Sequence, residues 1–303
     1  MQRPDPFRER RPHKQEGGTE VPGFRNPTDT IPGHRLRKDL GQHFLRDERV
    51  LDAVMAAAGI APGMRVLEIG PGPGNLTQRL ADAVGAKGEV VAIEADKALA
   101  PHLEGKWPNV RLIVADAVQT DLGALGRFDR IVANLPYLIS GPITVAFLQL
   151  LREPAHRWDR AVLMYQAEFA QRLLASAGDD SYGRLSVHVA RWTRATKVRD
   201  VAPGAFEPAP KVDSMVVLLE PHAKPPFAVA DEALWTAVVD GSFQQRRKQM
   251  RNTVPPVVAR LGVDKDDAVA ALTDLDLLTE RPEQVAPARF AELVAALAAT
   301  RGA

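Results

Sequence analysis

Between residues 64 and 166 the chain alternates short apolar runs with stretches of helical spacing, and this alternation constrains its fold more than any other feature. The apolar runs read as strands buried on both faces: MRVLEIG (64–70), EVVAIEA (89–95), VRLIVAD (110–116), FDRIVAN (128–134) and RAVLMYQ (160–166). Helical spacing marks NLTQRLADAV (75–84), DKALAPHLEG (96–105) and PITVAFLQLLRE (142–153). Strands and helices that alternate in this way predict an α/β fold, with a mostly parallel sheet covered on both sides.

The flanking segments have different textures. Residues 1–35 combine Pro, Gly and charge without periodicity, which predicts a disordered polar tail. KVDSMVVLLE (211–220) is expected to close the sheet of the domain at 36–222, in the antiparallel direction. From residue 223 to residue 303 the pattern is helical, in DEALWTAVVDGSF, VPPVVARLGV, KDDAVAALTDLDLL and PARFAELVAALAAT. We therefore expect a small, all-helical second domain.

Composition excludes several classes of site. The 303 residues include no cysteine, which rules out disulfides, thiolate zinc sites and a cysteine nucleophile. The histidines show no metal-ligand spacing, and no apolar run approaches the ~20 residues that span a bilayer. The polar start MQRPDPFRERRPHKQEGG lacks the apolar region of a secretory signal, so we expect a cytoplasmic protein without a membrane partner.

Positive charge is concentrated locally although the net charge is only +1. HRLRK (34–38) and QQRRKQMR (244–251) are dense basic clusters. Local clusters define an electrostatic footprint better than the net charge does, so each is a candidate contact for a phosphate backbone. A solvated surface is an equally good interpretation of either cluster alone.

A glycine loop follows the first predicted strand, in EIGPGPGN (68–75). Glycine at every second position lets the backbone pass close to a ligand. The spacing G-x-G-x-G differs from the G-x-G-x-x-G of dinucleotide sites, whose third glycine serves the pyrophosphate. S-adenosylmethionine has no phosphate, so a shorter glycine turn is sufficient for it.

A carboxylate ends each of the next two predicted strands. Glu94 lies at the distance from the loop that suits the two hydroxyls of a ribose, and Asp116 could accept a hydrogen bond from an adenine amino group. The alternative interpretation is a tight turn followed by two helix-capping acids.

The fourth predicted strand ends in Asn134-Leu135-Pro136-Tyr137. An exocyclic adenine amine must pyramidalise before it accepts a methyl group. The Asn134 side-chain oxygen and the Leu135 carbonyl can hold both amine hydrogens in that geometry. Pro136 fixes the backbone, and Tyr137 offers a face on which a base can stack. The alternative is a turn that ends a strand, with Tyr137 as a packing residue.

Taken together, these motifs resemble the KsgA-type rRNA adenine N6-dimethyltransferases, which include the Dim-type enzymes of archaea and eukaryotes. The resemblance covers about residues 36–254. It depends on motifs that occur in the family's order: LGQHFLRD (40–47), EIGPGPGNLT (68–77), IE (93–94), DA (116–117), NLPY (134–137), YGRLSV (182–187), AFEPAPKVDSMVV (205–217) and FQQRRKQMRN (243–252).

The resemblance implies a Rossmann-like methyltransferase domain that transfers methyl groups from S-adenosylmethionine to N6 of two adjacent adenosines. These adenosines lie near the 3′ end of small-subunit rRNA, and the partner is this rRNA or an immature small subunit. We expect the enzyme to be a monomer. The residues that the family motifs carry over to the cofactor site are Gln42, His43, Leu45, Glu68, Gly70, Gly72, Glu94, Asp116, Ala117 and Asn134.

The family motifs also imply contacts with the RNA. Asn134 to Tyr137 would hold the target base, and Phe206 would stack on its other face. Arg246, Arg247, Lys248 and Arg251 would contact the phosphate backbone. His43 departs from the family, because Asn is commonest there in bacterial members; this leaves its polar contact open.

Three other functions compete with this interpretation. The first is a large-subunit (23S) rRNA adenine methyltransferase of the macrolide-resistance type, although those enzymes favour a Phe-like residue where this chain has Tyr137. The second is a methyltransferase acting on DNA adenine or on a protein amide, since the same motif suits any planar NH₂ group. The third is an RNA-binding factor without activity.

Overall fold

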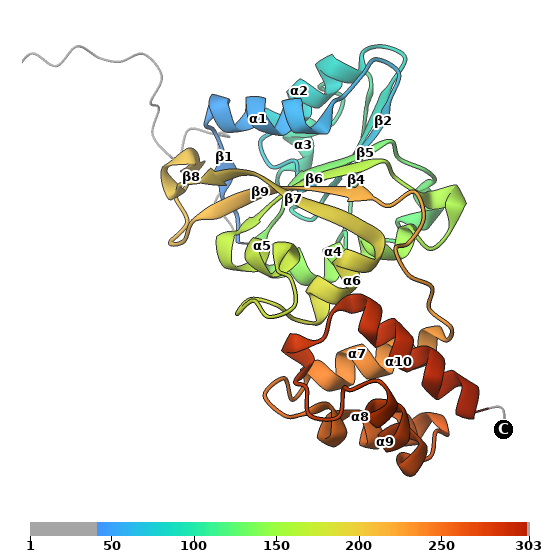
Figure 1. The fold of residues 1–303 in the computed structure, drawn as a ribbon. Coiled ribbons are helices and arrows are strands. Elements are labelled where there is room, and N and C mark those ends of the chain that lie inside the picture. The colour runs from blue at the N-terminus through green and yellow to red at the C-terminus, as the bar shows by residue number, and fades with distance from the viewer. Residues whose placement is uncertain (1–40, 302–303) are drawn as a thin grey trace, which may run out of the picture.

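The computed structural model describes residues 41–301, so the predicted tail at 1–35 and the basic cluster at 34–38 lie outside the described residues. A seven-stranded sheet has the order β4-β3-β2-β5-β6-β9-β7 (Figure 1). β2 to β6 run parallel, and β9 runs antiparallel to both β6 and β7. The bounds are β2 Arg65–Ile69, β3 Glu89–Glu94, β4 Val110–Val114, β5 Arg130–Asn134, β6 Arg160–Gln166, β7 Thr193–Val201 and β9 Ser214–Pro221. The predicted α/β sheet and the antiparallel closing strand are confirmed.

Helices cover both faces of this sheet, and Figure 1 shows α1 to α3 on one side and α4 to α6 on the other. Their bounds are α1 Glu48–Ala58, α2 Asn75–Val84, α3 Ala100–Leu103, α4 Ser140–Leu150, α5 Ala167–Leu174 and α6 Arg184–Trp192. Alternate residues of one strand enter two different cores: Val66 packs under α1 and α2, whereas Leu67 packs in the core that includes Phe147 of α4. Burial on both faces explains why these strands read as continuous apolar runs.

Three strands do not follow from the apolar pattern. β7 is an edge strand whose sequence TRATKVRDV is half polar, because most of its residues are exposed or half-buried. β1 (Phe44–Leu45) and β8 (Phe206–Glu207) form a separate antiparallel pair. Each has two residues, too short for any periodicity, yet the pair joins the first described segment to the chain that precedes β9.

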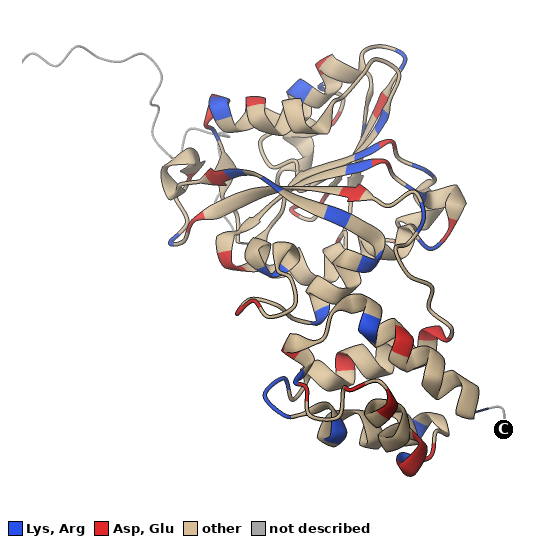
Figure 2. Cartoon of the chain, in the orientation of Figure 1, with Lys and Arg blue, Asp and Glu red and all other residues tan. Residues whose placement is uncertain are grey.

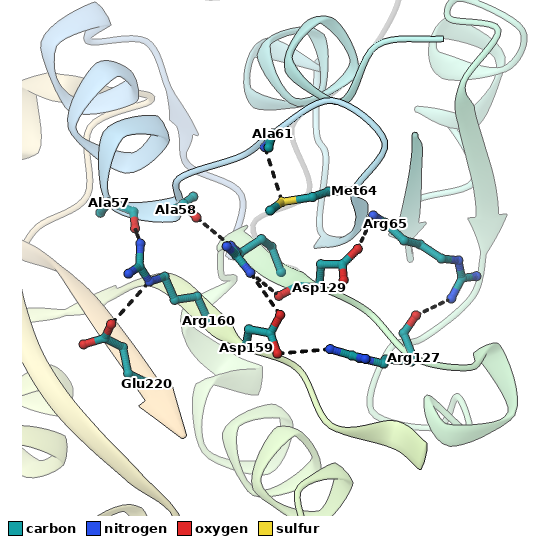
Figure 3. A network of polar contacts seen from close by, with 11 residues as sticks. Ala57, Ala58, Ala61, Met64, Arg65, Arg127, Asp129, Asp159, Arg160 and Glu220 are labelled. Atoms are coloured by element: carbon teal, nitrogen blue, oxygen red, sulfur yellow. Dashed lines mark hydrogen bonds and ion pairs between the residues drawn. The ribbon is translucent and has the colours of Figure 1, made fainter. Parts of the chain in front are cut away.

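A network of charged groups connects the amino ends of the parallel strands (Figure 3). Arg65 at the start of β2 donates to Glu89 Oε2 at 2.6 Å, and its backbone N–H donates to Asp129 Oδ2 at 2.7 Å. Arg130 Nε donates to the Ala58 carbonyl at 2.7 Å, and Arg160 Nη1 approaches the Ala57 carbonyl at 3.4 Å. The last turn of α1 has no basic residue of its own, so cations from two strands complement the negative end of this helix.

Beyond the sheet, the C-terminal region folds into helices, as predicted. They are α7 Glu232–Phe243, α8 Met250–Val258, α9 Lys265–Asp274 and α10 Pro287–Thr300, which share one core (Figure 1). This core includes Tyr182 and Val187, and the Tyr182 hydroxyl donates to the Val285 carbonyl at 2.9 Å. The helices therefore pack firmly on the chain at α6. Among residues 41–301, no helix is both long and apolar enough to cross a bilayer.

Candidate functional site

A cavity of about 280 Å³ opens at the carboxyl ends of the parallel strands. It lies where the chain order in the sheet reverses: β2 is flanked by β3 on one side and by β5 on the other. This switch point is the usual ligand site of open α/β sheets. The cavity is lined by Gly41, Gln42, His43, Phe44, Ile69, Gly70, Gly72, Ile93, Glu94, Ala95, Leu99, Ala115, Asp116, Ala117, Asn134, Leu135, Pro136, Tyr137, Leu138 and Ile139.

The glycine loop approaches both walls of this cavity closely. Gly70 has a φ of +67°, and a Cβ there would lie 3.4 Å from Pro136 Cδ. Gly72 has a φ of +57°, and a Cβ there would lie 2.9 Å from the Phe44 ring. Any larger residue at either position would therefore be strained by the positive φ, and at Gly72 it would also push against the Phe44 ring. The two glycines bring the end of β2 into contact with the NLPY segment and with β1.

Glu94 is held at the end of β3 by backbone N–H groups. Its Oε2 accepts from Gly72 N at 3.1 Å and its Oε1 accepts from Asp96 N at 2.8 Å. Burial raises the pKa of this carboxyl, which is only 6% exposed. Each oxygen keeps a second acceptor position, so the carboxylate can still receive two hydroxyl donors from a ligand. Gln42 Nε2 donates to Asp96 Oδ2 at 2.8 Å, which links the first described segment to the same corner.

Asp116 and Ala117 follow β4 and line the same cavity. Asp116 Oδ1 accepts from Val118 N at 2.9 Å, which fixes the turn and leaves Oδ2 as the further acceptor of an exposed side chain. Ala117 is buried and apolar. Glu94 and Asp116 thus stand at the ends of adjacent strands, as the sequence predicted.

Asn134 at the end of β5 has a fixed amide orientation. Its Nδ2 donates to the backbone carbonyl of His43 at 2.9 Å. Because only the nitrogen of the amide can donate, Oδ1 is the acceptor that Asn134 can offer to the cavity it lines. Leu135 and Pro136 line the cavity beside it.

Tyr137 is half-buried and held from two directions. Its hydroxyl bonds to Ser214 Oγ at 2.7 Å, and burial raises the pKa of the phenol. The His43 ring stacks against the Tyr137 ring at 5.6 Å between centroids and 29° between planes. His43 Nδ1 also lies 2.8 Å from the Pro208 carbonyl. His43 therefore supports Tyr137 with its ring and Asn134 with its backbone.

Three of the predicted site residues do not line the cavity. Leu45 and Phe206 pair across β1 and β8, and both side chains are buried in the core under α1 and α2. Glu68 lies in β2, next to Ile69, and is 1% exposed on the same side of the sheet as Val66. Side chains alternate along a strand, so Phe44 and Ile69 face the cavity and their neighbours face away. Phe206 is thus buried in the core of this structure, and its predicted role of stacking on the target base stays a prediction.

Glu68 is a buried acid behind the glycine loop. Burial raises its pKa to about 8, and the charge of Glu94 adds to the shift. Within residues 41–301, its Oε2 has no hydrogen-bond partner. A carboxyl in this position is protonated at neutral pH.

The basic segment lies on the loop between α7 and α8, where Figure 2 shows a concentration of positive charge. Arg246 is engaged within the protein: Nε donates to Glu283 Oε2 at 2.7 Å and Nη2 donates to the Asp180 carbonyl at 2.9 Å. Arg247, Lys248 and Arg251 are exposed. The four predicted basic residues thus divide into one that is bonded to Glu283 and Asp180 and three that are exposed.

Sequence reasoning missed several residues of the site. Asp96 positions both Glu94 and Gln42, and Ser214 positions Tyr137. Ser214 lies inside the AFEPAPKVDSMVV motif, so its neighbourhood was marked although its role was not. Leu99 and Phe44 form apolar wall, which ordinary core residues resemble in sequence.

Comparisons with known proteins agree with this geometry. A family model described as ribosomal RNA adenine dimethylase matches residues 33–280. The "Ribosomal RNA small subunit methyltransferase A" of Pseudomonas syringae pv. syringae is 40% identical over 269 residues, which are 86% of this chain and 94% of the relative.

Two solved structures have the same fold over most of the chain. A dimethyladenosine transferase from Plasmodium falciparum superposes with a TM-score of 0.72 at 29% identity, covering 85% of this chain and 98% of the other. The 23S rRNA methyltransferase ErmE superposes with a TM-score of 0.62 at 26% identity, covering 84% and 99%.

Proposed function

Because this chain belongs to the ribosomal RNA adenine dimethylase family, we propose that it methylates N6 of two adjacent adenosines near the 3′ end of small-subunit rRNA. The relative named as a small-subunit enzyme is 40% identical, whereas the 23S rRNA methyltransferase structure is 26% identical. The small-subunit substrate is therefore the better supported of the two rRNA targets. The methyl donor is S-adenosylmethionine.

The cavity fits this donor by the chemistry of its lining. Glu94 would accept both ribose hydroxyls through the second acceptor positions of its oxygens, and Asp116 would accept from the adenine amino group. Leu99, Ala117 and Leu135 would provide apolar contacts for the purine and the thioether chain. The bound donor supplies a methyl carbon that its sulfonium already activates.

The chain's own task is then to position the acceptor. Asn134 Oδ1 and the Leu135 carbonyl would each accept one hydrogen of the target N6 amine, which directs the nitrogen lone pair toward the donor. Tyr137 would carry the base on its ring, which Ser214 and His43 hold in place. As N6 forms its bond to the methyl carbon, the bond from that carbon to sulfur would break, the sulfur would leave as a neutral thioether, and N6 would lose one proton to solvent. Placement of this kind substitutes for a general base or a metal ion.

One observation carries this proposal: the Asn134 amide is already oriented by the His43 carbonyl, with its acceptor oxygen available to the cavity. An adenine must leave its stack to reach such a pocket, which costs least in a loop or a single strand.

Methyl transfer to small subunits from a strain that lacks the modification tests the substrate. We expect labelled methyl groups only in small-subunit rRNA, as N6-dimethyladenosine. Large subunits, naked DNA and release-factor protein are the matched acceptors for the competing activities. Methyl groups found only in large-subunit rRNA would contradict the proposal.

The exposed residues Arg247, Lys248 and Arg251 would bind the phosphate backbone. Removing one such cation from a phosphate should reduce the slope of log affinity against log salt by about 0.7 to 0.9. Replacing these three residues with Gln should therefore reduce the slope for subunit binding by about 2 to 3. Arg246→Gln is the contrasting variant, because its guanidinium is engaged with Glu283 and should affect stability more than the slope.

A further inference from the structure

Leu138 is an exposed apolar side chain at the mouth of the cavity. It is 70% exposed, more than any other large hydrophobic residue among residues 41–301; the others are Val114, Val145, Val212 and Val269. It also lines the cavity and lies beside Gly41, where an added Cβ would be 4.0 Å from Leu138 Cγ. Its exposure together with its place on the cavity makes Leu138 a candidate contact for a ligand that reaches the mouth.

Hydrogen bonds hold the turn that carries Leu138. Residues Tyr137–Ile139 form a 3-10 turn in which Ile139 N donates to the Pro136 carbonyl at 3.1 Å. The next residue, Ser140, begins α4, and its carbonyl accepts from Thr144 Oγ1 at 2.6 Å. The two neighbours of Leu138 are half-buried, so only this side chain of the turn projects outward. A side chain on a turn held in this way can keep its position when it contacts a partner.

A second exposed apolar residue lies on the loop that is bonded to two residues of the cavity. The segment 208–214 is attached at Pro208, whose carbonyl bonds to His43, and at Ser214, which bonds to Tyr137. Between these anchors, Lys211 and Val212 are exposed. Neither residue lines the cavity, so among residues 41–301 Leu138 is the one exposed large hydrophobic residue that does.

We propose that Leu138 is a wedge that packs against the base next to the target adenosine. This inference rests on the proposed function. With the target base on Tyr137, its sugar remains at the mouth, and Leu138 follows Tyr137 at the ~3.8 Å of one residue. The next base has lost its stacking neighbour, and Leu138 covers the exposed face. Apolar side chains that fill an opened base step are a known means of keeping nucleic acid unstacked.

The test is a double-mutant cycle between Leu138 and the neighbouring base. Small subunits are reconstituted with rRNA whose 3′ segment is synthetic and has either an intact or an abasic nucleotide beside the target, on each side in turn. On intact substrate, Leu138→Ala should lower kcat/KM about tenfold, because it removes three carbons that the base would cover on one side only, and Leu138→Met should restore most of it. With the abasic neighbour that matters, wild type and Leu138→Ala should differ less than twofold.

A fluorescent substrate gives a readout independent of methyl transfer. With 2-aminopurine at the target position, binding of wild-type enzyme should raise the fluorescence as the base leaves its stack, and Leu138→Ala should reduce this rise. Val269→Ala on α9 is the matched control, because it removes an exposed apolar group far from the cavity. It should leave both readouts unchanged.

Three results would overturn the wedge. One is the same tenfold loss for Leu138→Ala on intact and on both abasic substrates. Another is an unchanged fluorescence rise in Leu138→Ala. The third is a tenfold loss of S-adenosylmethionine affinity, which would place Leu138 in the donor site. Failure of the wild-type enzyme to methylate any small subunit would refute the proposed function instead.

Discussion

The amino ends and the carboxyl ends of the parallel strands use polar residues in opposite ways. At the amino ends of the strands, Arg65, Arg130 and Arg160 are each matched by carboxylates or helix carbonyls (Figure 3). At the carboxyl ends, Asn134 and Glu94 are held by backbone groups and keep acceptor positions for a ligand. Polar side chains that complete one another's hydrogen bonds add stability. Polar side chains that the backbone holds, and that keep an acceptor position unused, can bind a ligand. The amino ends of these strands are therefore the stabilising end of the sheet, and the carboxyl ends are its functional end.

The largest effect on activity is expected at the functional end, where the strands have their carboxyl ends. Asn134→Ala removes the acceptor for the target amine without removing a core side chain, so kcat should fall about 10²- to 10³-fold. Subunit binding should be unchanged, and the melting temperature should fall by a few degrees, because the His43 carbonyl loses its donor. Single-turnover methyl transfer and calorimetry measure the two quantities. Equal activity in the variant would remove Asn134 from the mechanism.

The two buried acids behind and beside the glycine loop give a sharper comparison. Glu94→Gln should weaken S-adenosylmethionine binding about 10- to 100-fold, because it replaces a charged acceptor and places an NH₂ group against a backbone N–H. Glu68→Gln is the control, since Glu68 is protonated and faces away from the cavity. Calorimetric titration checks both. Weaker donor binding by Glu68→Gln would support the role that the family motif implies for it.

At the stabilising end, a substitution should lower the stability of the protein and leave its activity unchanged. Arg130→Met removes donors to the carbonyls of Ala58 and Asp129 while it keeps an apolar stem. The free energy of unfolding should fall by about 1–3 kcal/mol. Activity well below the melting temperature should be unchanged. A parallel loss of kcat would show that the two ends of the strands are mechanically coupled.

Glu68 predicts a smaller effect that depends on pH. Its pKa rises from 4.5 to about 8 on folding, so the folded state holds an extra proton between these values. The free energy of unfolding should therefore fall as pH rises through this window, by up to about 1.4 kcal/mol per pH unit. Denaturant titrations at pH 6 and 7.5 should show this slope reduced in Glu68→Gln. An identical slope in both proteins would contradict the proton assignment.

Much of this protein was determined by sequence alone. Strands buried on both faces must be apolar throughout, so five parallel strands and the antiparallel β9 were visible as apolar runs. The glycine loop, the acids at two strand ends and NLPY were visible because backbone approach and hydrogen bonding restrict residue choice there. Eleven of the predicted site residues line the cavity: Gln42, His43, Gly70, Gly72, Glu94, Asp116, Ala117, Asn134, Leu135, Pro136 and Tyr137.

Only the tertiary structure decided which side each residue faces and which groups meet. A two-residue strand has no period, so nothing in the chain indicated that Phe44 faces the cavity while Leu45 and Phe206 face the core. β7 was missed because an exposed edge needs no apolar run. The contacts of Asn134 with His43 and of Tyr137 with Ser214 join residues 91 and 77 positions apart. Local preference specifies strands, helices and turns, but contacts over such distances exist only once the sheet has brought its carboxyl ends together.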